Sequence, residues 1–257
     1  MLKKNYLRIA CGTIYQFALL GFSRHHWWVW TDSINAILLI GVFSIIGTNF
    51  SSVYQTDQIY VIGMGLWVMV LLNRAYFGTA WTLMFHKLEH VLENLVMSPL
   101  PAWGWLGMII IEYVQNAIIA AMPFIILLLL FGMPIPSLSG FLLSVALLCL
   151  AMVFFTAFGF LMMLGAQKWN DLSKWDNTLI MPLFMLSGSF FDATALPEKY
   201  RFLMEWNPVY QLQYGIRQLW FLDHNPIAYN FLIWGGMTTF IIIISLIAIS
   251  RGYGLKQ

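Results

Sequence analysis

The chain has 257 residues, of which 60% are hydrophobic and only 9% are charged. Soluble domains carry roughly 25% charged residues, because water must solvate their surfaces. The composition therefore excludes a water-soluble globular protein and indicates an α-helical membrane protein whose solvent is lipid. Its length allows about five to seven spans of roughly 20 apolar residues each. That leaves no room for a soluble catalytic domain of ordinary size.

The net charge argues against a nucleic-acid-binding site, and the two cysteines argue against disulfides or a cysteine metal site. The formal net charge of +2 is too small to suggest a nucleic-acid partner. Cys11 and Cys149 lie far apart in apolar surroundings. Neither a disulfide framework nor a cysteine metal site is therefore indicated.

Residues 1–30 predict an amphipathic helix in the membrane surface. They begin with Lys3, Lys4 and Arg8 and continue as an uncharged stretch of 15 residues, from 9 to 23. That stretch is short for a span and ends at Arg24, before two histidines and two tryptophans, a combination typical of the interface. The alternative is a short, tilted span, which would invert the topology of everything after it.

Six spans are predicted after this helix. Asn73 and Arg74 interrupt the second, glycine and proline at 132–136 break the chain after the third, and residues 168–176 look like a compact charged loop. Residues 192–224 are polar but rich in aromatic rings, as expected of helices that lie at the interface or re-enter the membrane. The predicted spans are residues 33–50, 58–85, 103–131, 138–167, 177–191 and 226–250.

The basic residues predict the orientation. Positive residues favour the cytoplasmic side of a membrane protein. Six spans place nine on the side of both termini and three on the other, with Arg74 inside a span. The nine are Lys3, Lys4, Arg8, Arg24, Lys87, Lys168, Lys174, Arg251 and Lys256, and the three are Lys199, Arg201 and Arg217. We therefore expect both termini in the cytoplasm of a bacterial-type inner membrane.

Arg74 and Glu112 are the charges predicted to lie within spans. A charge at the centre of a span costs about 2.5–3.5 kcal/mol on insertion scales, so such residues usually pair or face water. Each is about equally deep on adjacent antiparallel helices, which makes a mutual salt bridge geometrically possible. A structural ion pair is the favoured interpretation over a contact with cargo.

Few motifs point to chemistry within this chain. Neither the phosphate-binding G-x-x-x-x-G-K-[ST] loop nor a G-x-G-x-x-G turn is present, so any ATP hydrolysis belongs to another chain. His86, Glu89 and His90 form an H-x-x-E-H string, the inverted zinc-peptidase pattern. In a short surface segment the string is more often part of an exposed charged helix. We therefore expect no catalytic residue, metal or cofactor in the chain.

Several strings resemble one family. Residues 92–101, LENLVMSPLP, are similar to the L-E-x-L-x-x-[SA]-P-[LV]-P segment of type-2 ABC exporter permeases. Residues 181–191, MPLFMLSGSFF, resemble that family's P-x-x-x-x-S-G-x-F-[FY] run. An N-D-L string at 170–172, an L-P at 196–197, W-N-P-V-Y at 206–210 and G-I-R at 215–217 keep the family's order. The resemblance covers about residues 85–220.

The resemblance implies a half-transporter. Two permease copies, expected to be a homodimer, would assemble in membrane lipid with two cytoplasmic ATPase subunits that bind ATP and Mg²⁺. Residues 86–101 would be the coupling helix that docks on the ATPase, and residues 192–224 would be re-entrant outer helices. The coupling residues would be Lys87, Glu89, Glu93 and Ser98, and the outer gate residues Phe190, Phe191, Asn207, Tyr210 and Arg217.

The cargo stays open at this level. Drugs, lipids and lipid-linked glycans all suit such a family, and the many tryptophans fit interfacial belts as well as a sugar path. An ATP-independent carrier is the other alternative to the exporter. Such carriers often show inverted repeats with broken helices at matching positions, and no convincing repeat is present here.

Overall fold

The structure is a computed structural model. It describes Thr31, residues 34–35, 37–42 and 58–90, Leu92, and residues 101–190, 197–221 and 227–254. The regular structure in this part of the chain is all helical, without a strand, which confirms the all-α class. Its helices are α3 (Gln58–Leu88), α5 (Ala102–Leu130), α6 (Leu138–Gly165), α7 (Trp169–Trp175), the π-helix η1 (Asp176–Ile180), α8 (Met181–Met185), α9 (Glu198–Glu205), α10 (Pro208–Phe221) and α11 (Ile227–Ser250).

Four of these helices are long and apolar enough to cross a membrane. They are α3, α5, α6 and α11, which match the predicted second, third, fourth and sixth spans. α3 runs unbroken through Asn73 and Arg74. Pro123 lies inside α5 without ending it, as neighbouring helices in a bundle permit. Most of the predicted first span lies outside the described residues, although residues 37–42 are helical.

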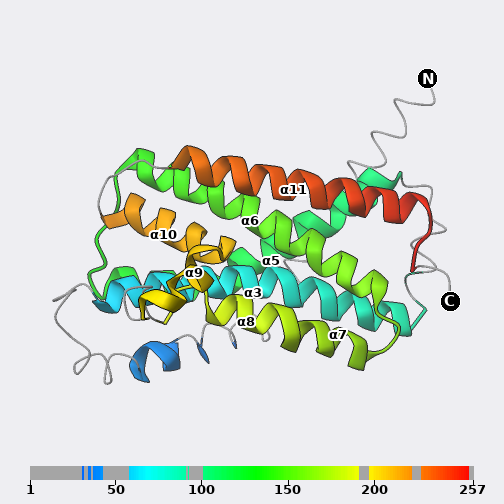
Figure 1. Cartoon of the computed structure of the whole chain (residues 1–257), viewed down its shortest axis with the longest axis horizontal. Coiled ribbons are helices and arrows are strands. Elements are labelled where there is room, and N and C mark those ends of the chain that lie inside the picture. Colours follow the sequence, from blue (N-terminus) through cyan, green and yellow to red (C-terminus); the bar gives the residue numbers. More distant parts are fainter. Residues whose placement is uncertain are drawn as a thin grey trace.

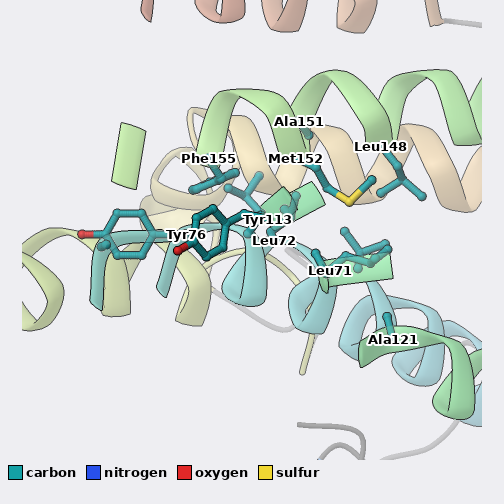
Figure 2. Packing of buried hydrophobic residues seen from close by; sticks show 14 of the residues in the cluster. Leu71, Leu72, Tyr76, Tyr113, Ala121, Leu148, Ala151, Met152 and Phe155 are labelled. Atoms are coloured by element: carbon teal, nitrogen blue, oxygen red, sulfur yellow. The ribbon is translucent and has the colours of Figure 1, made fainter. Parts of the chain in front are cut away.

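Among the long helices, α3 lies against both α5 and α6 (Figure 1). α11 lies along α6 on the side away from α3. Figure 2 shows Met152 and Phe155 of α6 in the same apolar cluster as Leu72 and Tyr76 of α3. At the α3–α6 crossing a methyl group on Gly159 would lie 2.7 Å from the Tyr76 carbonyl oxygen. Small residues allow this approach, which is how membrane helices gain contact area.

The bundle has two distinct ends. At the first, the elbow end, Lys87 in the last turn of α3 meets the end of α6, and a Cβ at Gly254 would collide with the Leu164 carbonyl. At the opposite end, the α10 end, the Tyr60 hydroxyl donates to the Phe131 carbonyl at 2.9 Å. A methyl on Gly140, at the start of α6, would there lie 2.9 Å from a carbonyl of α10. The contacts at the two ends thus agree with the predicted antiparallel order of α3, α5 and α6.

The predicted fifth span and the loop before it are corrected by the structure. Residues 168–176 are not a loop, because α7 begins at Trp169. The helical run then continues through η1 and α8 and ends at Met185, six residues before the predicted limit of 191. The run is shorter than the four spanning helices, so the predicted count of six spans is not established by the described residues. The charges that suggested a loop sit instead on the first turns of a helix.

The predicted outer segment, 192–224, contains two helices in its described part. α9 and α10 are separated by Trp206 and Asn207. α10 packs against α3, α6 and α11 at the α10 end, and Figure 1 shows it between α6 and α3. Proline at the first position of α10 suits a helix start, since that residue has no use for an N–H donor. The segment is therefore part of the helical packing.

Candidate functional site

A buried polar cluster joins three helices at the α10 end. The Ser189 hydroxyl donates to the Gly65 carbonyl at 3.2 Å. The Gln213 amide donates to the hydroxyl oxygens of Ser189 at 2.7 Å and Ser187 at 3.3 Å. Each of these three polar side chains is at most 1% exposed. We call the set the SGS cluster; its members are Gly65, Ser187, Gly188, Ser189, Gln213 and Arg217.

Two glycines make the SGS cluster possible. Gly188 has a φ of +80°, a left-handed conformation that costs glycine nothing, and its carbonyl accepts from Arg217 Nη2 at 2.6 Å. A methyl group on Gly65 would lie 2.6 Å from Arg217 Nη2 and 2.9 Å from the Ser189 Cα. The turn after α8 can therefore approach α3 only because residue 65 has no side chain.

Two other predicted gate residues meet the same turn. The Asn207 Oδ1 accepts from the Val209 N–H at 2.9 Å, which caps the start of α10. Its Nδ2 donates to the Leu183 carbonyl at 2.7 Å and so ties α10 to α8. The Tyr210 ring covers Gly188, where a methyl group would lie 2.7 Å from its Cδ2.

The structure thus brings together Asn207, Tyr210 and Arg217 on residues 183–189. Phe190 follows directly and packs half-buried against the hydrophobic core. Phe191 lies outside the described residues. The sequence did not predict Gly65 and Gln213 as members of the cluster, because 148 residues separate them in the chain. In the structure the amide of Gln213 donates to the Gly65 carbonyl at 3.4 Å. An apolar stretch interrupted by a glutamine was the available signal.

Lys87, predicted to contact the ATPase, forms hydrogen bonds within this chain, and its contact with an ATPase stays a prediction. Its Nζ donates to the carbonyls of Ala166 at 2.8 Å, Leu164 at 3.2 Å and Met163 at 3.4 Å. The side chain is buried, with 8% exposed. The last carbonyls of a helix lack partners within it, and a cation there also complements the helix dipole. Lys87 therefore joins the last turn of α3 to the end of α6.

The residues after Lys87 form an elbow. α3 ends at Leu88, and His90 has a φ of +57°, which turns the chain away from the helix axis. Glu89 is exposed at this turn, while Leu92 is buried in the hydrophobic core. The predicted coupling residues Glu93 and Ser98 lie outside the described residues.

The turn removes the geometry that the zinc hypothesis requires. In the H-x-x-E-H pattern two histidines stand one turn apart on a continuous helix. Here His86 is on α3, whereas His90 follows its end in a left-handed conformation. No group of three His, Cys, Asp or Glu side chains gathers for a metal among the described residues. The string is better explained as a helix end.

The predicted intramembrane charges lie near one another on adjacent helices. Arg74 is on α3 and Glu112 on α5, and both are half-buried. The Tyr113 hydroxyl lies within electrostatic reach of both charges. A methyl on Gly78 would lie 3.5 Å from the Tyr113 ring and 3.9 Å from Arg74. The direct salt bridge between Arg74 and Glu112 stays a prediction.

Asp176 is a buried acid that the sequence interpretation missed. Its carboxylate accepts from the Tyr76 hydroxyl at 2.8 Å and from the Trp81 indole N–H at 2.9 Å. The residue is 4% exposed and opens η1. Trp81 in turn stacks on Trp169 of α7, with ring centroids 5.1 Å apart. Assigning 168–176 to a solvated loop concealed this acid, although an apolar stretch follows it directly.

The polar groups described here connect helices rather than assemble a reaction centre, and four apolar helices joined in this way define a polytopic helical membrane protein. Family comparison specifies the class. Residues 10–221 match the ABC-2 type transporter family, and the chain belongs to it. It is therefore a transmembrane permease of an ABC transporter, as the motifs suggested.

Curated relatives agree with the family match. The inner membrane transport permease YadH of Escherichia coli K12 is 28% identical over 222 residues, which cover 83% of each chain. Proteins of the same name from Escherichia coli O157:H7 and Shigella flexneri match to the same extent. The similarity thus extends over most of both chains.

Proposed function

We propose that this chain is the permease subunit of an ATP-driven exporter in a bacterial inner membrane. It works as a pair of copies with two cytoplasmic ATPase subunits, which bind the ATP and Mg²⁺. Its cargo is an amphiphilic molecule of drug, lipid or glycan type, taken from the cytoplasm or the inner leaflet. Both chain ends lie in the cytoplasm.

The elbow is the observation on which the proposal rests. Glu89 is exposed directly after α3, which packs against both α5 and α6. The last turn of α3 is joined to the end of α6 by the Lys87 ammonium. A force on the elbow therefore reaches two spans at once, as a motor outside the membrane requires.

The basic residues support the orientation. Lys87, Lys168, Lys174 and Arg251 all belong to helix ends or turns at the elbow end. Lys199, Arg201 and Arg217 belong to α9 and α10. A cytoplasmic elbow end follows the positive-inside preference, and it puts the exposed acid where an ATPase can contact it.

The SGS cluster supports a gate at the outer end. α9 and α10 serve as re-entrant helices, and the cluster closes them onto α3 and α8 when the ATPases are apart. ATPase closure moves the elbows and breaks the cluster bonds, which opens a path for the cargo. The hydroxyl and amide bonds of the cluster suit this step, since neutral hydrogen bonds contribute only about 0.6 kcal/mol each between membrane helices, and Arg217 adds one charged donor.

The test is an elbow charge reversal. The permease is co-expressed with a candidate ABC ATPase subunit from the same organism, and the complex is purified in detergent. We expect Glu89→Arg to lose most of the bound ATPase. The variant replaces an acid with a base, which would be repelled if the docking groove of the ATPase is basic, as the proposal requires. Glu198→Arg is the matched control: its carboxylate is 90% exposed at the other end of the molecule.

If Glu89→Arg retained the ATPase, the elbow would not be part of the docking surface and the proposal would be contradicted. Equal losses in both variants would show a general effect of surface charge. A selective loss with an intact, monodisperse permease supports the proposal.

A further inference from the structure

The helical run of residues 169–185 contains a π turn at its centre. The Met181 N–H donates to the Asp176 carbonyl, five residues back rather than four. Such a turn holds one extra residue. Each residue of an α-helix turns the chain by about 100°, so everything after the π turn faces about 100° away from where a regular helix would place it.

Pro182 explains why the run cannot be a regular helix here. Proline has no N–H, and its ring collides with the carbonyl four residues back, here that of Thr178. A wider turn just before the proline relieves that collision. Pro182 therefore requires an irregular turn before it, but it does not determine which residues form that turn.

Asp176 can determine which residues form the π turn. It is the first residue of η1, and its two carboxylate oxygens accept from Tyr76 and Trp81 on α3. Both bonds are made away from solvent, since the carboxylate residue is 4% exposed. The start of the π turn is therefore tied to a helix that it does not belong to.

The segment before the π turn has contacts besides Asp176, one of which it makes with Trp81, the residue that also donates to Asp176. Trp169 stacks on Trp81, and Leu172 is fully buried. The segment after it leads directly into the SGS cluster: Phe184 is buried, and Ser187 follows within the next turn. The rotation of α8 about its axis consequently decides whether the SGS cluster can form. The position of α7 depends on other contacts, those of Trp169 and Leu172.

We propose that Asp176 is a positioning residue that locks the register of α8 through Tyr76 and Trp81. With the carboxylate bonded, the extra residue stays at 176–180 and α8 presents Ser187 and Ser189 to α3. Without it, the extra residue moves along the run or disappears, α8 turns, and the SGS cluster opens. The role of Asp176 in holding α8 does not depend on the proposed function; only the idea that opening the SGS cluster serves transport rests on it.

Spin-label accessibility tests the lock. Met185 after the π turn is 58% exposed and Trp175 before it is 50% exposed, so each can carry a nitroxide on an introduced cysteine after Cys11 and Cys149 are replaced by serine. The full chain is placed in lipid nanodiscs, and oxygen accessibility is measured at both sites. In Asp176→Leu we expect the label at 185 to lose accessibility while the label at 175 keeps it.

Three further variants keep the test decisive if Asp176→Leu folds poorly. Asp176→Asn retains one acceptor oxygen and should restore most of the accessibility at 185. Tyr76→Phe and Trp81→Phe each remove one donor and should shift it partway in the same direction. Because the residues act together, adding Tyr76→Phe to Asp176→Leu should change nothing more.

Unchanged accessibility at 185 in Asp176→Leu would show that Pro182 alone sets the turn, and would overturn the lock. Equal changes at 175 and 185 would overturn it too, since they would mean that the whole run detaches. No ATPase is present in this assay, so its outcome is independent of the Glu89 experiment.

Discussion

The two ends of the bundle are joined by different kinds of bond. At the elbow end one buried ammonium, that of Lys87, serves three carbonyls at the end of α6. At the α10 end the SGS cluster divides its bonds among two serine hydroxyls, the Gln213 amide and the Arg217 guanidinium, which connect α3, α10 and the turn after α8. Hydrogen bonds to a charged group contribute about 1.5–3 kcal/mol, whereas neutral ones between membrane helices contribute about 0.6 kcal/mol.

The difference suits a machine driven from one side. A joint made by a single charged group either holds or fails as a unit, so it carries force without yielding. A joint made of several weak bonds can open one bond at a time. The elbow end is therefore built to transmit a movement, and the α10 end is built to undergo one.

The largest effect is expected from removing the Lys87 ammonium. Lys87→Met keeps the unbranched apolar chain but leaves three carbonyls near the end of α6 without their donor. We expect the free energy of unfolding to fall by about 3 kcal/mol, the scale of bonds to a buried charge. Denaturant titration of the chain in detergent micelles measures it.

Lys174→Met is the matched control for that loss. The Lys174 side chain is 75% exposed, although it too lies at the elbow end. Its replacement should leave the unfolding curve unchanged. Equal effects of the two variants would mean that net charge, not the α3–α6 joint, stabilises this end.

A smaller effect is expected at the SGS cluster. Gln213→Leu removes the donor to Ser187, Ser189 and Gly65 while preserving the volume of the buried side chain. We expect a loss of about 1 kcal/mol in the same titration, because neutral bonds between membrane helices average only 0.6 kcal/mol each.

Gln211→Leu provides the comparison on the same helix. The Gln211 amide donates to the Glu205 carbonyl in an exposed position, outside the cluster. If Gln213→Leu cost as much as Lys87→Met, the two ends would be equally rigid and the contrast between them would be wrong.

The sequence predicted the parts of the fold that depend on length and hydrophobicity. α3, α5, α6 and α11 each present a long, predominantly apolar stretch, so their existence and order could be deduced. The fifth segment was assigned wrongly because charges at its start resembled a loop. Asp171 and Lys174 bond to each other on one face of α7, so the helix accommodates them.

The candidate site was predicted where a local string defines it and missed where distant residues meet. Asn207, Tyr210 and Arg217 belong to recognisable strings and do converge on residues 183–189. Gln213 and Gly65 meet only after folding, so no spacing rule places them together. For Lys87, charge suggested exposure, but only the structure shows that the end of α6 lies within its reach.

The smallest effect is expected at Asp171, which tests whether exposed bonds at the elbow end matter. The hydrogen bond from Lys174 lowers the pKa of the Asp171 carboxyl below its ordinary value, and the N–H groups of Gln167 and Lys168 act in the same direction. A lowered pKa means that folding favours the ionised form, so any stabilisation is present above the ordinary pKa of aspartate and is lost as the pH falls through the lowered value. Surface pairs are screened by water and contribute little, so we expect Asp171→Asn to leave the unfolding midpoint at pH 7 unchanged and the acid side of its pH profile slightly flatter. A clear loss of stability at pH 7 would show that the start of α7, and not only the buried Lys87, holds the elbow end together.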